Sequence, residues 1–109
     1  MLISGSLLLA ANTRSANVLA GEQFEFVPAR SLVNVRLSAS AVGVRVDLNV
    51  GGELQLANAV VPQTNRFPVK PDDDMCSFGA RRAERLLLSF LNTTGAGITI
   101  FWAIEIVPM

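Results

Sequence analysis

The residues that could do chemistry in this chain are few, and their types exclude most enzymatic mechanisms. The sequence has no histidine and no tyrosine, so the commonest general base and the commonest metal ligand are missing. Cys76 is the single cysteine, and Arg81 and Arg82 nearby could activate its thiol. No histidine can take the thiol proton, so we expect a half-buried structural residue. We therefore expect no enzymatic activity, no catalytic residue and no cofactor.

An acidic run, Asp72, Asp73 and Asp74, is the strongest candidate for a metal site. Carboxylates clustered on a loop are typical ligands of calcium. The run lacks the spaced acidic positions and the glycine of an EF-hand loop. A solvated loop, or a salt bridge to an arginine of a neighbouring chain, is favoured over a metal site.

Arg81, Arg82 and Arg85 form a basic cluster, but Glu84 lies inside it. No aromatic residue lies between these arginines to stack on a base. Nine basic and nine acidic residues give a formal net charge of zero, so no global field attracts nucleic acid or an anionic membrane. We expect no direct binding of nucleic acid, and we expect the arginines to form ion pairs at an interface.

The elements that must carry these residues are strands. Apolar and polar residues alternate through residues 31–50 and 98–107, which is the pattern of strands with one buried face. Further strands are predicted over residues 2–10, 22–27 and 86–91. In residues 22–27, Phe24 and Phe26 share one face, and Pro28 ends the strand. Trp102 lies on the apolar face of the last strand and is predicted to anchor the core.

Two turns have a predicted geometry. Directly opposed residues of a hairpin face the same side of the sheet. A three-residue loop over residues 50–52 therefore places Leu48 opposite Leu54, with Gly52 in a left-handed conformation. A five-residue loop over residues 93–97 likewise places Phe90 opposite Ile100 and Leu88 opposite Trp102.

Residues 60–80 break the alternation and predict a long connection with a short edge strand near Cys76. Connections of this length carry a strand from one sheet to another in Greek keys and jelly rolls. We therefore predict an all-β antiparallel sandwich of the jelly-roll or Greek-key type with about eight strands. The chain is predicted to be a single domain, with an N-terminal strand or arm over residues 1–20 and the sandwich over residues 21–109.

The composition favours a permanent partner surface. Hydrophobic residues make up 50% of the 109 residues, and the 8 glycines raise this share to about 57%, above the roughly 45–50% of an average soluble domain. Surplus apolar surface and zero net charge both promote association. Singly scattered alanine and valine residues would need no partner, and this alternative stays open.

The N-terminal segment is too apolar for a free tail. Its short run Leu7, Leu8 and Leu9 imitates the core of a secretory signal, but no basic residue precedes it. No window of 18 apolar residues exists, so we expect no membrane span. We expect contacts with the protein's own sheet or with another chain to order this segment.

Three further features carry a resemblance to known proteins. The first is the segment Gly21-Glu22-Gln23-Phe24-Glu25-Phe26, which leads into the sandwich. The others are the loop over residues 68–74 and the predicted hairpin loop Asn92-Thr93-Thr94-Gly95-Ala96-Gly97 before the last strand. With them the chain resembles the small single-domain β proteins of bacteriophage virions, namely decoration (cement) proteins and minor jelly-roll capsid proteins.

The resemblance implies a structural role in a virion assembled in the host cytoplasm. Expected partners are further copies of the chain, forming a homo-oligomer, and the major capsid protein or another shell protein. No membrane is among the expected partners. An alternative is a non-catalytic ligand- or carbohydrate-binding β-sandwich module. Such modules present aromatic platforms, for which this chain offers Trp102 and six phenylalanines.

Overall fold

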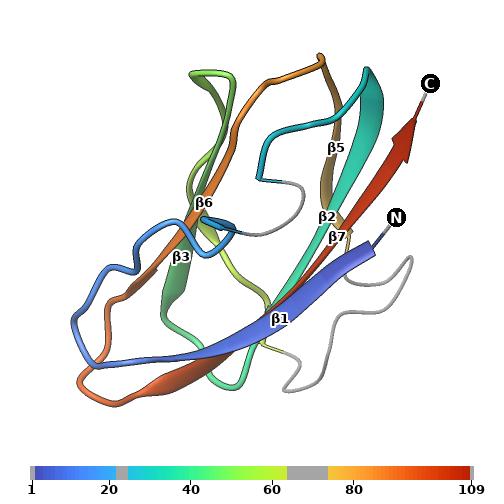
Figure 1. Cartoon of the computed structure of the whole chain (residues 1–109). Coiled ribbons are helices and arrows are strands. Elements are labelled where there is room, and N and C mark those ends of the chain that lie inside the picture. Colours follow the sequence, from blue (N-terminus) through green and yellow to red (C-terminus); the bar gives the residue numbers. More distant parts are fainter. Residues whose placement is uncertain (1, 22–24, 64–73, 109) are drawn as a thin grey trace.

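Alternating apolar residues form the strands of this protein. In β3 (Val44–Val50) and β6 (Leu86–Asn92) every second residue is buried, as expected for strands with one face on a core. The computed structural model describes residues 2–21, 25–63 and 74–108 (Figure 1). These residues form seven strands and no helix. The other strands are β1 (Leu2–Leu9), β2 (Ser31–Ala39), β4 (Glu53–Val60), β5 (Asp74–Ala80) and β7 (Ile98–Pro108).

The strands form two antiparallel sheets. Sheet A has the order β1-β7-β2-β5, and sheet B has the order β4-β3-β6. Figure 1 shows the two layers, with β3 and β6 on the left and β1, β7, β2 and β5 on the right. The protein is therefore an all-β antiparallel sandwich, as predicted.

The core lies between the sheets and contains the predicted anchor. Trp102 of β7 is 7% exposed, and its ring stacks on Phe90 of β6 with centroids 6.1 Å apart and an interplanar angle of 27°. This contact joins sheet B to sheet A. The predicted burial of Trp102 is confirmed. Other fully buried side chains are Leu19, Val33, Val35, Leu37, Leu48, Leu86, Leu88, Ile100, Ile104 and Ile106.

The predicted hairpin between residues 86–91 and the last strand is wrong. β6 belongs to sheet B and β7 to sheet A, so residues 93–97 carry the chain across the sandwich. Ile100 pairs with Leu7 and Ala39, and Phe90 pairs with Val46. Alternation alone cannot separate two strands side by side from two strands facing each other across a core, because both arrangements bury the same side chains.

The predicted three-residue loop over residues 50–52 is also wrong. Val50 pairs with Glu53, so the turn contains only Gly51 and Gly52, with φ angles of 57° and 86°. Two left-handed glycines favour the two-residue hairpin turn whose twist matches that of the strands. The register then shifts so that Leu48 pairs with Leu56, and Leu54 is left 53% exposed.

Residues 11–21 and 25–27 run beside β6 without forming a regular strand. The described part of the predicted strand over residues 22–27 makes one bridge, between Phe26 and Arg85. Phe26 is 54% exposed and Val27 is buried, so the side that carries Phe26 faces solvent. Phe24 lies outside the described residues. The described chain therefore has seven strands where about eight were predicted.

Side chains replace strand pairing along this segment. Ser15 Oγ accepts a hydrogen bond from the Phe90 N–H at 2.9 Å, and Asn17 Oδ1 accepts one from the Leu88 N–H at 3.0 Å. Ser15 N–H also donates to the Phe90 carbonyl at 2.7 Å. Serine and asparagine side chains compete in this way with regular backbone ladders. The outer edge of β6 is thus occupied.

The connection between β4 and β5 passes from sheet B to sheet A, as predicted for a long crossover. β5 lies at the end of sheet A and contains Cys76, so the predicted edge strand is confirmed. β1 occupies the other end of sheet A, where it pairs with β7 along its whole length. The N-terminal segment is therefore ordered by the protein's own sheet. The described residues contain no helix of the length and apolarity that a membrane crossing requires.

Candidate functional site

The single thiol lies against the core. Cys76 is opposite Val35 in the β2–β5 pair, half-buried and free of any disulfide. Burial raises the pKa of the Cys76 thiol, which disfavours the reactive thiolate. An unactivated thiol of this kind fits the structural role predicted for it.

The acidic run cannot be placed as a unit. Asp72 and Asp73 lie outside the described residues, and Asp74 begins β5. Within the described chain, no group of three or more cysteine, aspartate or glutamate side chains could hold a metal ion. The interpretation of the run as a solvated loop or an ion pair, in preference to a metal site, therefore stays a prediction.

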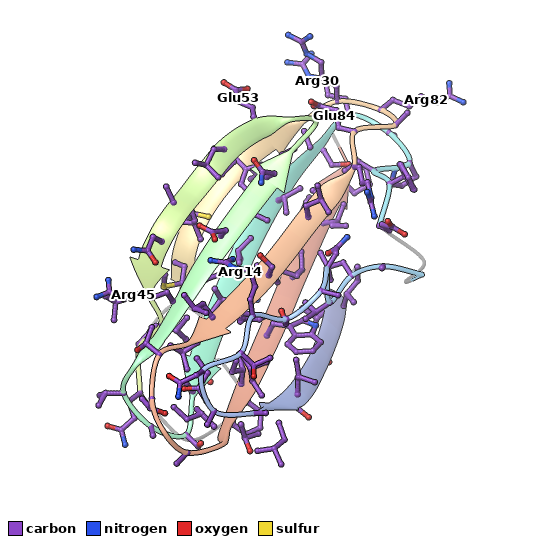
Figure 2. All side chains as sticks on the ribbon, turned by 90° about the vertical axis from the view of Figure 1, so that its left-hand side faces the viewer. Arg14, Arg30, Arg45, Glu53, Arg82 and Glu84 are labelled. Atoms are coloured by element: carbon purple, nitrogen blue, oxygen red, sulfur yellow. The ribbon has the colours of Figure 1, made fainter. Side chains whose placement is uncertain are left out.

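The basic cluster gathers at one end of the sandwich. Figure 2 shows Arg30, Arg82 and Glu53 projecting there, beyond the ends of the sheets. Arg30 and Arg81 line a surface hollow of about 190 Å³ together with Gly79 and Ala80. Pockets for small molecules usually enclose about 300–1,000 Å³ and are largely apolar. This hollow is too small and too exposed for a substrate site.

Arg85 forms an ion pair within the chain. Its Nε lies 2.6 Å from Oε2 of Glu25. The Gly21 N–H and the Arg85 guanidinium hold the pKa of Glu25 below its ordinary value. Because Arg85 is already paired, its predicted role in an ion pair at an interface has no support from these contacts. The pair instead joins residues 25–27 to the residue before β6.

A polar network crosses the outer face of sheet B, where Figure 2 shows Arg14 and Arg45. Asp47 of β3 accepts hydrogen bonds from the Asn58 N–H at 2.7 Å and from Arg14 Nη1 at 2.6 Å. Both bonds lower the pKa of Asp47, and the bond from the Asn58 N–H has the larger effect. Arg14 also donates to Ser89 at 3.3 Å. The network joins Arg14 to the three strands β3, β4 and β6, so these contacts stabilise the fold.

Asn92 organises the loop between β6 and β7. Its side chain is fully buried, and its Nδ2 donates to the carbonyls of Leu9 and Ala96 at 3.1 and 2.7 Å. Its Oδ1 accepts from the N–H and the hydroxyl of Thr94 at 2.9 and 2.7 Å. Both ends of the amide are therefore used inside the fold.

The strands at the ends of the sheets differ in how well they are protected. β4 carries two register shifts and a left-handed residue, Asn58, and the β2–β5 pair carries one shift. Bulges of this kind discourage pairing with a further strand. β1 pairs with β7 in unbroken register from Leu2 to Leu9, and it contains no charged residue and no proline. β1 is the edge that lacks the usual protection.

The outward side chains of β1 are apolar at both ends. Leu2 is 62% exposed and Leu8 is 70% exposed, while Ile3 and Leu7 pack against the core. Their apolar character is visible in the sequence. Their position at a sheet edge depends on the pairing with β7, far along the chain, and no local pattern predicts it.

Gly5 lies at the centre of β1, directly opposite Trp102. A Cβ atom on Gly5 would lie 2.6 Å from Trp102 Cζ2 and 2.8 Å from Cε2, so the indole occupies the space of the missing side chain. A glycine inside a strand often marks such a close approach.

Comparisons of the sequence with models of protein families and with curated proteins find no match. The features that bear on function are therefore the edge strand, the core and the order of the strands.

Proposed function

We propose that this protein is a structural component of a virion, either a capsid decoration (cement) protein or a minor capsid component. It acts by self-association and by docking on a shell protein. Its partners are further copies of the chain and the major capsid protein or another shell protein. Its location is the virion, after assembly in the host cytoplasm.

The observation that carries the proposal is the order of the strands. β1-β7-β2-β5 packs against β6-β3-β4, and residues 11–21 and 25–27 run beside β6 in the place of a further strand. We infer that the sandwich is a jelly roll, a fold used by viral capsid domains and also by lectins and cupins. Because a fold does not define a function, the strand order supports the proposal by analogy.

The surface supplies a second support. The described residues offer no metal cluster, and the hollow beside Arg30 is smaller than a usual small-molecule pocket, whereas β1 presents an uncharged, apolar edge. Burial of such an edge against a neighbour is a common way to join subunits. With a formal net charge of zero, the chain also has no long-range self-repulsion to oppose assembly.

The carbohydrate-binding alternative depends mainly on an exposed Trp102, and Trp102 is buried. Trp102 is 7% exposed and stacked inside the core, so it cannot form an aromatic platform for a sugar. Among the described phenylalanines, Phe26 is the one that is largely exposed, at 54%, and a single ring does not make a platform. The structural role is therefore the better supported of the two.

Light scattering of the purified protein and electron microscopy of antibody-labelled virus particles test the proposal together. We expect an oligomer in solution and regular labelling of the particle surface or shell. A monomer at high concentration, absent from every particle, would rule the proposal out. Specific binding to a glycan array by that monomer would favour the module.

A further inference from the structure

The edge of β1 has a pattern that reads the same in both directions. From Leu2 to Leu8 the residue types are apolar, apolar, serine, glycine, serine, apolar, apolar, so Gly5 lies at the centre. Serines 4 and 6 face outward together with Leu2 and Leu8, and all four are exposed. A strand that is symmetric about its centre is complementary to an antiparallel copy of itself.

We infer that β1 joins two copies of this chain, as an antiparallel β1–β1 pair with a two-fold axis at Gly5. The inference rests on the self-association proposed above and names the surface that performs it. In this register Leu2 lies opposite Leu8 of the partner copy, Ser4 opposite its Ser6, and Ile3 opposite its Leu7. Two-fold axes of this kind are the commonest way in which identical chains associate.

The register follows from the faces of the strand. A two-fold axis perpendicular to the sheet keeps outward residues opposite outward residues. Moving the axis to Ser6 would pair as many residues of β1, but it would place Ser4 opposite Leu8 and Gly5 opposite Leu7. The axis at Gly5 matches leucine with leucine and serine with serine, and such cross-strand pairs are the stabilising unit of a sheet.

Nothing in the described chain blocks this edge. β1 is the last strand of sheet A, and its unbroken register with β7 leaves alternate N–H and C=O groups pointing away from the sheet. Pairing with a second β1 would satisfy these groups and produce one continuous sheet, with four strands from each copy. Leu2 of each copy would be covered by Leu8 of the other copy.

A charge-exchange series at Leu2 and Leu8 tests the pairing and its register. The double variant Leu2→Lys/Leu8→Lys places lysine opposite lysine at both ends of the pair. We expect the dissociation constant of the assembly to rise about tenfold or more. The variant Leu2→Glu/Leu8→Lys places glutamate opposite lysine twice and should restore association at low salt. Sedimentation velocity measures both.

The matched control lies on β4, the edge strand of the other sheet. Leu54 and Val60 are 53% and 58% exposed, so Leu54→Lys/Val60→Lys adds the same charge at similarly exposed apolar positions. We expect this variant to associate like the unaltered protein. Cooperative unfolding and the fluorescence of the buried Trp102 confirm that each variant is folded.

Directed cross-linking gives a second, independent readout. In a Cys76→Ser background, chains carrying Ser4→Cys are mixed with chains carrying Ser6→Cys under a mild oxidant. Directly opposed residues have Cβ atoms about 4.5–5.5 Å apart, close to the spacing that a disulfide needs. The mixed pair should cross-link faster than either chain with itself.

The outcomes separate the surface from the function. An oligomer that keeps its mass in Leu2→Lys/Leu8→Lys, without preferential mixed cross-linking, would overturn the β1 pairing and leave self-association standing. A protein that stays monomeric also overturns the pairing, while labelling of particles decides the virion role separately. Loss of association in the lysine variant and its recovery in the glutamate–lysine variant would support the β1–β1 pairing.

Discussion

Gly5 and Trp102 behave as one packing unit. The indole fills the space that a side chain on Gly5 would take, and it also stacks on Phe90. The edge strand is therefore held on the core by the only tryptophan of the chain. Any side chain at Gly5 must push this ring, and with it the contact between the sheets.

Replacing Gly5 by alanine should destabilise the fold. The added Cβ would lie 2.6 Å from Trp102 Cζ2, and overpacking of this kind costs about 1–3 kcal/mol. Gly79 is the matched control, because it lies in β5 at the other end of the same sheet, with nothing within 4 Å of an added Cβ. Gly79→Ala should change stability by less than about 0.5 kcal/mol. Urea unfolding measures both; equal effects would contradict the role of the indole.

At this scale the sequence predicts part of the arrangement. The position of Trp102 among alternating isoleucines predicts its burial correctly. The partner residue does not follow, because β1 and β7 lie at opposite ends of the chain. The candidate interface therefore needed the three-dimensional pairing, even though the symmetric pattern around Gly5 is printed in the sequence.

Among the elements, the hairpin of β3 and β4 combines a tight turn with an irregular partner strand. The turn of Gly51 and Gly52 brings β4 into a register that exposes Leu54. A second shift leaves Asn58 in a left-handed conformation, and the Asp47 carboxylate holds its N–H. β4 is thus attached to its sheet partly through a charged side chain.

The contribution of Asp47 should depend on pH. Its pKa is lowered in the folded protein, so its stabilising effect is complete above the unfolded value of about 3.9. The effect is lost as the pH falls through the lower, folded value. Unfolding of the unaltered protein and of Asp47→Asn should therefore differ most near neutral pH and converge in acid.

Glu53→Gln is the control for this experiment, because it removes an exposed carboxylate at the neighbouring turn. Its stability difference from the unaltered protein should not follow that of Asp47→Asn. A difference for Asp47→Asn that stays constant through the acidic range would show that the carboxylate charge is not what holds β4.

The elements also show where the sequence stops being informative. Alternation identifies β2, β3 and β7 because each has one face on the core. It wrongly predicts a hairpin after β6. A connection that crosses between the sheets and a hairpin both leave the same alternate residues buried, so the pattern cannot distinguish them. Residues 11–21 escape prediction for another reason. Ser15 and Asn17 supply side-chain hydrogen bonds where strand residues would supply backbone bonds.

For the whole molecule, the N-terminal segment is part of the sandwich. β1 belongs to sheet A, and Leu19 and Val27 bury their side chains in the core. Removal of residues 1–20 therefore takes away a strand and a core residue, together with the groups that bond to the edge of β6. The segment stabilises the fold in addition to any role at an interface.

Deletion of residues 1–20 should abolish cooperative unfolding. The loss of β1 uncovers Trp102, and the expected cost exceeds about 5 kcal/mol, the whole stability of many small domains. Tryptophan fluorescence during urea unfolding is the measurement. Leu2→Lys/Leu8→Lys keeps the strand and should still unfold cooperatively, so it separates loss of the fold from loss of association. A truncated protein with a sharp transition would show that the segment is an appendage.

The pairing of β1 with β7 also determines when the protein can fold during its synthesis. β1 leaves the ribosome before every other strand, whereas its partner is translated after all of them. Pairings between such distant segments form slowly, and unpaired apolar strands invite contact with other chains. On a polysome, each nascent chain has an unpaired β1 until its own β7 has been synthesised. Slower translation of the last strand would therefore lengthen the time in which β1 can contact another chain.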